Sequence, residues 1–212
     1  MTFGLIIFDC DGVLVDSEPL ATGVMAEMAR ELGLPIHAEE ALDRFVGRNV
    51  EQCVSEIEAE LNRPIPENFI REFRRRSADT FEEKLSPVPG VRSILDRIST
   101  PYCLASSAPR SKIILTLTIT DLLKYFDGKI FSGYEVGSWK PDPGLFLTAA
   151  ARYNVPPVRC AVIEDSNAGV QAGLAAGMNV FRYDPKREIT PAGDGKVVSF
   201  RVMSDLITLL RI

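Results

Sequence analysis

The sequence predicts an α/β fold in which helices wrap a parallel sheet, with a helical segment inserted after the first strand. Short apolar runs, which suit strands buried on both faces, alternate with helical patterns. Only one stretch, residues 17–85, breaks this alternation. Of the 212 residues, 46% are hydrophobic and 25% are charged, so a sizeable core can be buried.

The apolar runs predict four strands, and helical spacing of apolar residues predicts five helices around them. The predicted strands are residues 5–8, 102–105, 161–163 and 179–181. The predicted helices are residues 91–98, 111–117, 143–153, 166–176 and 203–210. Alternation of this kind is typical of a parallel sheet whose strands are joined through helices.

The insert contains helical patterns at 21–32, 51–61 and 67–84 and no convincing strand. A Pro/Gly segment at 86–90 cannot continue a helix and closes it. The predicted domains are a core of residues 1–16 and 87–212 and a helical domain of residues 17–86. A few additional surface helices, or a lid over a site at the sheet edge, would each explain the insert, and the residues that flank it favour the lid.

Composition and net charge disfavour several classes of binding partner. The formal net charge of -5 disfavours nucleic acid and anionic membrane surfaces. No apolar run approaches the roughly 18 residues that a membrane span needs, and the first run is too short for a signal peptide. The four cysteines form no CxxC pair, which indicates a reducing, cytoplasmic setting without disulfides. We expect a monomer or a small homo-oligomer.

Two acids, Asp9 and Asp11, follow the first predicted strand in the run FDCDG. Ligands of parallel α/β sheets bind outside the carboxyl ends of the strands. Two crowded carboxylates repel each other unless a cation or proton lies between them. Gly12 permits a tight turn and the approach of backbone N–H groups to an anion. A calcium-binding loop is disfavoured, because the next three residues are apolar and offer no side-chain oxygen.

Three later clusters are weak one by one. Ser106 and Ser107 follow the second strand, where a hydroxyl either holds a phosphoryl oxygen or caps a helix. Lys140, in WKPDP, is either an exposed loop lysine or a fixed ammonium that neutralises phosphate. Glu164 and Asp165 follow another apolar strand, where a metal would offset the cost of burying charge and helix capping is the alternative. One edge of a parallel sheet can bring all of these groups together.

In this order, the four clusters resemble the motifs of the haloacid dehalogenase-like hydrolase superfamily, over residues 2–183. The insert resembles the helical cap of the phosphoglycolate phosphatase and β-phosphoglucomutase branch, which implies a Rossmann-like core with an inserted cap domain. Residues 131–143, FSGYEVGSWKPDP, are similar to bacterial sugar-phosphate phosphatases, the 6-phosphogluconate phosphatase type in particular. This implies a small phosphorylated metabolite, such as a sugar or sugar-acid phosphate, as substrate.

The resemblance implies a Mg²⁺-dependent phosphatase that forms an aspartyl-phosphate on Asp9. Asp11 becomes the general acid that protonates the leaving alcohol and the base that activates water. The implied phosphate-binding residues are Ser106, Ser107 and Lys140. The implied Mg²⁺ ligands are Asp9, the main-chain carbonyl of Asp11, and Asp165, with Glu164 as a further ligand or a support for the others.

Other activities remain as alternatives. A 2-haloacid dehalogenase of this superfamily needs neither a metal nor an acid at the second position, so Asp11 together with Asp165 favours phosphate. A β-phosphoglucomutase carries a cap histidine where Ala21 stands, and the only histidine here, His37, lies elsewhere. A non-catalytic metal-binding module would keep the fold, but all expected catalytic residue types are present. In the insert, Arg48 lies in the run Gly47-Arg48-Asn49 and either meets a substrate carboxylate or hydroxyl or is a solvated loop arginine.

Overall fold

The computed structural model describes residues 2–45, 48, 50–185 and 197–212. The chain forms two compact units, one made of Met1–Val15 and Ser86–Ile212 and the other of Asp16–Leu85. We call them the core unit and the helical unit. None of the helices in the described ranges has the length and apolarity that crossing a membrane requires.

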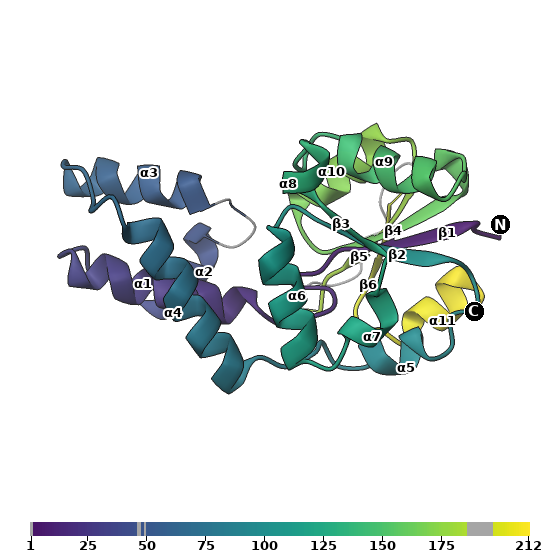
Figure 1. Ribbon diagram of the computed structural model, residues 1–212, viewed down its shortest axis with the longest axis horizontal. Coiled ribbons are helices and arrows are strands. Elements are labelled where there is room, and N and C mark those ends of the chain that lie inside the picture. Colours follow the sequence, from purple (N-terminus) through teal and green to yellow (C-terminus); the bar gives the residue numbers. More distant parts are fainter. Residues whose placement is uncertain (1, 46–47, 49, 186–196) are drawn as a thin grey trace. The chain divides into compact units, whose positions relative to one another are not determined.

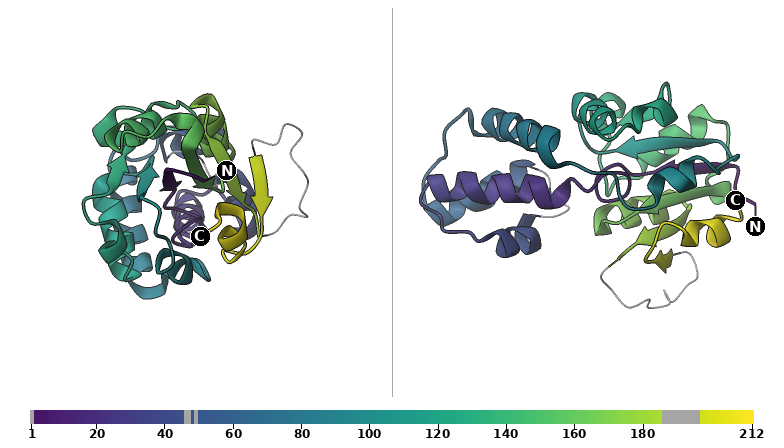
Figure 2. Two further views of the ribbon diagram at one scale, coloured as in Figure 1. Left: turned by 90° about the vertical axis from the view of Figure 1, so that its right-hand side faces the viewer. Right: turned by 90° about the horizontal axis from the view of Figure 1, so that it is seen from below.

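The described residues of the core unit form a six-stranded sheet in the order β3-β2-β1-β4-β5-β6 (Figure 1). The strands are β1 (Leu5–Phe8), β2 (Tyr102–Ser106), β3 (Ile130–Ser132), β4 (Cys160–Glu164), β5 (Asn179–Tyr183) and β6 (Val197–Phe200). Each neighbouring pair is parallel, and Ile7 of β1 is level with Cys103 and Val162 on its two sides. The edge strand β6 is the yellow arrow in Figure 2. The predicted α/β fold with a parallel sheet is confirmed.

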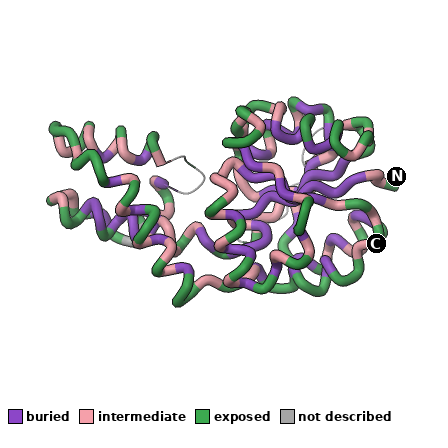
Figure 3. The backbone as a smooth tube through the Cα atoms, viewed as in Figure 1, coloured by how far each residue is buried: buried purple, intermediate pink, exposed green. Residues whose placement is uncertain are grey.

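Helices cover both faces of this sheet (Figure 1). Leu5 and Ile7 pack into one cluster with Leu145 and Phe146, on the face covered by α9 and α10. Figure 3 shows the central strands as continuous buried stretches, which explains why they read as apolar runs. The helices of the core unit are α5 (Val91–Leu95), α6 (Arg110–Ile119), α7 (Leu123–Phe126), α8 (Gly133–Val136), α9 (Gly144–Arg152), α10 (Asn167–Ala175) and α11 (Asp205–Leu210).

The helical unit contains helices and no strand among its described residues. Its apolar side chains form a core of their own, in which Met25, Ile57 and Phe73 are buried. Of the run around Arg48, the two neighbours Gly47 and Asn49 lie outside the described residues. The helices are α1 (Glu18–Glu31), α2 (Ala38–Phe45), α3 (Val50–Leu61) and α4 (Phe69–Lys84).

Among the elements absent from the sequence-based prediction are β3, β6, α2 and the four-residue helices α7 and α8. β3 has only three residues and β6 lies at the sheet edge, where Phe200 alone is buried, so neither gives a clear apolar run. α2 has eight residues, which is short for a helix to be recognised by periodicity. These elements depend on their neighbours in the fold more than on their own sequence.

Candidate active site

The carboxyl end of β1 lies where the strand order reverses, because β2 and β4 flank β1 on opposite sides. This is where open α/β sheets bind ligands. Asp9 follows β1 directly, and its backbone N–H donates to the Ile163 carbonyl at 3.0 Å. The residue is 7% exposed. The pairing with β4 therefore fixes a nearly buried carboxyl group at the switch point.

The turn after Asp9 requires glycine at position 12. Gly12 has a φ of 78°, in the left-handed region, and its N–H donates to the Val15 carbonyl at 2.9 Å. A Cβ atom at this position would lie 2.0 Å from Oδ2 of Asp165. Glycine is thus needed twice, for the backbone conformation and for the close approach of Asp165.

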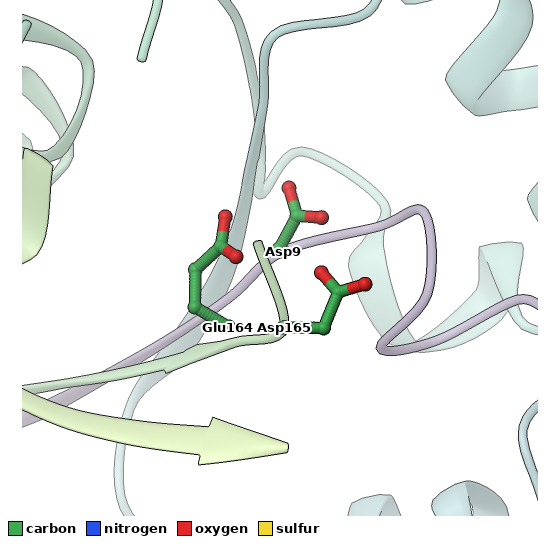
Figure 4. Close-up of side chains that lie close together, drawn as sticks. All are labelled: Asp9, Glu164 and Asp165. Atoms are coloured by element: carbon green, nitrogen blue, oxygen red, sulfur yellow. The ribbon is translucent and has the colours of Figure 1, made fainter. Parts of the chain in front are cut away.

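Three carboxyl groups converge at the ends of β1 and β4 (Figure 4). Asp9, Glu164 and Asp165 each offer an oxygen within 4.8 Å of the others. Glu164 is fully buried, and its Oε2 accepts from the N–H of Ser166 at 2.7 Å and from its hydroxyl at 3.0 Å. A Cβ at Gly169 would lie 1.7 Å from Glu164 Oε1, so only glycine lets α10 approach.

Lys140 places its ammonium group among these acids. It pairs with Asp9 and, at 2.7 Å, with Oε1 of Glu164. The lysine side chain is 6% exposed, so the interpretation of Lys140 as an exposed loop lysine is wrong. Its backbone N–H donates to Ser107 Oγ at 3.3 Å, which joins two of the sequence clusters directly.

The loop that carries Lys140 is held by hydrogen bonds at the start of α9. Ser138 Oγ donates to Asp142 Oδ1 at 2.7 Å and accepts from the N–H of Leu145 at 3.1 Å. The same Asp142 oxygen accepts from the N–H of Gly144 at 2.8 Å. These bonds satisfy donors that a helix start leaves unpaired, and they fix the loop around Lys140.

Ser106 ends β2 and is 2% exposed. Its hydroxyl oxygen accepts from the N–H of Ala108 at 3.1 Å, which tightens the turn into α6. Ser132, at the end of the neighbouring β3, donates its hydroxyl to the Ala108 carbonyl at 2.7 Å. The turn after Ser106 is therefore anchored to two strands.

The two helix-capping interpretations are wrong. The residue at the N-cap of α6 is Pro109, and Ser107 uses its hydroxyl on Lys140 instead. The N-cap of α10 is Ser166, whose hydroxyl accepts from the N–H of Gly169 at 3.0 Å. Asp165 is therefore not the cap of that helix, and its carboxylate belongs to the acidic cluster.

Asp11 contacts a lysine that lies outside the four sequence clusters. Lys112, in the first turn of α6, donates from Nζ to Asp11 Oδ2 at 2.9 Å. Burial alone would lower the pKa of Lys112, but the attraction of Asp11 outweighs it and raises the pKa above its usual value. The only sequence signal for this contact is the position of Lys112 in the helix that follows Ser106, and surface lysines are common in such places.

Burial and neighbouring charges shift the pKa values of the groups at the site in opposite directions. Burial raises the pKa of the Asp9 carboxyl group to about 7, although the ammonium of Lys140 lowers it, and Glu164 and Asp11 raise it further. Burial alone would lower the pKa of Lys140, but Asp9 and Glu164 outweigh it and raise the pKa above its usual value. One lysine therefore does not fully offset the cost of the crowded carboxylates.

The donor set of the acidic cluster fits Mg²⁺. Carboxylate and carbonyl oxygens suit this hard cation, and histidine and cysteine are not among the clustered residues. The surrounding ionisable groups carry four negative and two positive formal charges when ionised, a sum of minus two that a divalent cation would balance. These groups are Asp9, Asp11, Glu164, Asp165, Lys112 and Lys140.

Arg48 belongs to the helical unit and is already engaged there. Its Nη1 donates to the Arg44 carbonyl at 3.2 Å and pairs with Glu56 Oε2. The arginine side chain is 43% exposed. A substrate group that binds this guanidinium would have to compete with Glu56.

Known proteins resemble this chain over nearly its full length. The model of the haloacid dehalogenase-like hydrolase family matches residues 6–183. A 6-phosphogluconate phosphatase of Escherichia coli is 33% identical over 95% of this chain and 91% of its own. A phosphorylated carbohydrates phosphatase of Thermotoga maritima is 34% identical over 82% of this chain and 81% of its own.

A solved structure supports the same relationship. A conserved haloacid dehalogenase-like protein of unknown function from Agrobacterium tumefaciens has a TM-score of 0.84 and 32% identity, covering 99% of this chain and 98% of that one. The fold, the ordered motifs and these relatives agree. The chain belongs to the haloacid dehalogenase-like hydrolase family and is a phosphatase of that family.

Proposed function

We propose that this phosphatase hydrolyses a sugar phosphate or sugar-acid phosphate through an aspartyl-phosphate on Asp9, with Mg²⁺ as cofactor. The observation that carries the proposal is the contact of Lys140 with both Asp9 and Glu164 at the switch point of the sheet. A fixed cation beside a nearly buried carboxylate suits the transfer of a negatively charged phosphoryl group.

In the first step, a carboxylate oxygen of Asp9 attacks phosphorus while the bond from phosphorus to the substrate oxygen breaks. Asp11 gives its proton to the leaving alcohol. In the second step, Asp11 takes a proton from water as the water attacks the phosphoryl group on Asp9. Inorganic phosphate leaves, and both acids return to their starting state.

The phosphoryl group is held by this chain's own donors. The ammonium of Lys140 binds one of its oxygens, and the hydroxyl groups of Ser106 and Ser107 bind others. Mg²⁺ would be held by the carboxylates of Asp9 and Asp165 and by the main-chain carbonyl of Asp11, and it supplies charge neutralisation in the transition state. In this arrangement Glu164 fixes Lys140 and adds to the negative charge that attracts the cation.

The substrate class rests on relatives and on residues 131–143. The similar proteins include a hexitol phosphatase B of Escherichia coli, 31% identical over 81% of this chain, in addition to the two carbohydrate-directed enzymes named above. The helical unit acts in this proposal as the cap that selects the substrate. The four buried free thiols support a reducing, cytoplasmic setting.

A phosphate-release assay on a panel of phosphorylated sugars, sugar acids, nucleotides and glycolate tests the proposal. We expect Mg²⁺-dependent release that is fastest with a sugar or sugar-acid phosphate, and a folded but inactive Asp9→Asn variant. Chloride release from a 2-haloacid without metal would favour dehalogenase activity instead. Interconversion of sugar phosphate isomers would favour a mutase, and near-normal activity of Asp9→Asn would remove Asp9 as nucleophile.

A further inference from the structure

Lys112 and Asp11 meet from sequence positions 101 residues apart. Lys112 Nζ lies 2.9 Å from Asp11 Oδ2, and the two side chains are 34% and 21% exposed. The pair is thus partly shielded from water, unlike ion pairs on the surface of the molecule. Each partner also has a backbone that the fold holds in place.

The backbone of Lys112 is fixed by α6. Its N–H donates to the Pro109 carbonyl at 3.0 Å, and the next residue, Ile113, is buried against the core. The neighbouring Arg110 turns elsewhere, toward the Ile130 carbonyl and Glu135. The first turn of α6 therefore presents its lysine to Asp11 and its arginine to a different part of the unit.

The backbone of Asp11 is fixed by the turn after β1, where Asp11 and Val15 form an isolated bridge. With the main chain held, the orientation of the Asp11 carboxyl group depends on its side-chain torsions. A charge-assisted hydrogen bond to Oδ2 restricts those torsions. Proton transfer is sensitive to this orientation, because the donor must lie within hydrogen-bond reach of the departing oxygen.

We propose that Lys112 is a positioning residue that aims the Asp11 carboxyl group at the leaving oxygen of the substrate. The inference rests on the proposed function. The ammonium of Lys112 keeps its own proton and holds Oδ2, and the transferable proton of Asp11 is then carried by Oδ1. As the bond between phosphorus and oxygen breaks, that proton moves to the leaving oxygen and Asp11 becomes a carboxylate.

Varying the leaving group of the substrate distinguishes a positioning role of Lys112 from phosphate binding and from a purely structural role. A strongly acidic phenol departs without a proton, whereas a weakly acidic one needs the acid. The value of kcat/KM reports the steps up to the first departure of the leaving group. The experiment therefore compares kcat/KM for 2,4-dinitrophenyl, 4-nitrophenyl and phenyl phosphate, with saturating Mg²⁺, in the wild type and in variants of Lys112.

We expect Lys112→Met to lower kcat/KM for phenyl phosphate about tenfold to hundredfold, a part of what general acid catalysis supplies. For 2,4-dinitrophenyl phosphate the change should stay within about threefold, since this ester needs little acid assistance. Lys112→Arg should restore much of the loss, because the guanidinium can make the same charge-assisted bond. The matched control is Lys124→Met, which removes an ion pair with Asp121 beyond the other end of α6 and should change none of the three esters.

An equal loss for all three esters would overturn the inference, since a phosphate-binding or merely structural lysine acts on every ester alike. No loss for any ester would overturn it as well. Thermal unfolding of each variant shows whether a loss of activity comes from misfolding. If Lys112→Met misfolds, the same comparison of the three esters is made with Lys112→Arg and tests the inference. A wild type that releases phosphate neither from these esters nor from any member of the sugar and sugar-acid phosphate panel would overturn the proposed function itself, and this inference with it.

Discussion

The site of the core unit and the surface of the helical unit hold ion pairs of opposite kinds. At the site, Lys140 meets Asp9 across 131 residues of sequence, and the side chains are 6% and 10% exposed. On α4, Arg75 meets Asp79 only four residues away, and both side chains are 60% exposed. Charged residues are equally conspicuous in both parts of the sequence, but their surroundings differ completely.

The difference in exposure determines how much each kind of ion pair contributes to the stability of the fold. An exposed pair of the Arg75 kind contributes little to stability, because water and salt screen it. Removing one partner of a buried pair costs about 3–5 kcal/mol, because the other charge is left without compensation. A protein keeps such a buried arrangement where chemistry requires it, so the comparison itself points to the site.

The largest effect is expected for Lys140→Met. Without the ammonium, Asp9 and Glu164 lose their shared cation, so urea unfolding in the presence of a chelator should show a loss of about 3–5 kcal/mol. Phosphate release with saturating Mg²⁺ should fall about 10²–10³-fold, the cost of removing one fixed donor to a developing charge. Arg75→Met is the control from the helical unit, and it should leave both the unfolding curve and the turnover essentially unchanged. Equal changes in the two variants would contradict the comparison.

Gly12→Ala should weaken Mg²⁺ binding. The new Cβ would lie 2.0 Å from Asp165 Oδ2, so the carboxylate must move away from the acidic cluster. We expect the Mg²⁺ concentration for half-maximal phosphate release to rise about 10–100-fold, the usual effect of disturbing the support of a metal ligand. Gly128→Ala is a matched control, because its φ of 68° imposes similar backbone strain with open space around it. The same Mg²⁺ dependence in both variants would show that the clash is irrelevant.

The stability of the metal-free protein should depend on pH through Asp9. Burial raises the pKa of Asp9 from 3.8 to about 7, so the folded state binds the proton more tightly than the unfolded state. The stability from this group is complete below about pH 4 and is lost as pH rises toward 7. Unfolding of the wild type and Asp9→Asn in chelator should therefore differ in slope over this range, with the variant the flatter of the two.

An acid of the helical unit provides the opposite sign. Hydrogen bonds from Arg75 and Arg76 lower the pKa of Glu72 from 4.5 to about 2. Its small contribution to stability is present above pH 4.5 and is lost as pH falls toward 2.

The Asp9 prediction has a clear contrary outcome. Identical slopes for wild type and Asp9→Asn between pH 4 and 7 would mean that Asp9 is not held in a desolvating site.

The smallest effect is expected for Arg48→Ala. If Arg48 binds a carboxylate or hydroxyl of the sugar substrate, KM for that substrate should rise about fivefold to tenfold, since the competing pair with Glu56 offsets part of the bond. KM for 4-nitrophenyl phosphate should stay constant. Arg75→Ala, from the same unit, should change neither value. Equal changes in KM for both substrates would remove Arg48 from the specificity role.

The sequence predicts the fold best where strands are buried on both faces. The first predicted strand, residues 5–8, coincides with β1, and the strand at 102–105 misses only Ser106 of β2. The sequence-based prediction misses the short strand β3 and the edge strand β6, because both owe their conformation to neighbouring strands. Exposed charged residues need no such support, and Arg71, Arg74 and Arg75 lie on the exposed side of α4.

For the site, the residue pattern alone singles out the acids, whereas Lys140 is identified only through the family resemblance and Lys112 is missed. Asp9 and Glu164 stand at the ends of apolar runs, where carboxyl groups are unexpected unless they have a partner. Lys140 by itself resembles a loop lysine, and Lys112 resembles any lysine near the start of a helix. Only the folded chain brings these ammonium groups to Asp9 and Asp11, since each contact spans more than 100 residues of sequence.

Trapping the phosphorylated enzyme tests directly whether Asp9 is the nucleophile. The protein would be mixed with Mg²⁺ and its best phosphate ester, quenched in acid within one turnover, digested and examined by mass spectrometry. If Asp9 is the nucleophile, the peptide that contains Asp9 gains one phosphoryl group in the wild type, and no phosphoryl group is added in Asp9→Asn. A phosphoryl group on another residue would exclude Asp9 as the nucleophile. Rapid turnover of the wild type without a trapped adduct, together with continued turnover of Asp9→Asn, would exclude it as well.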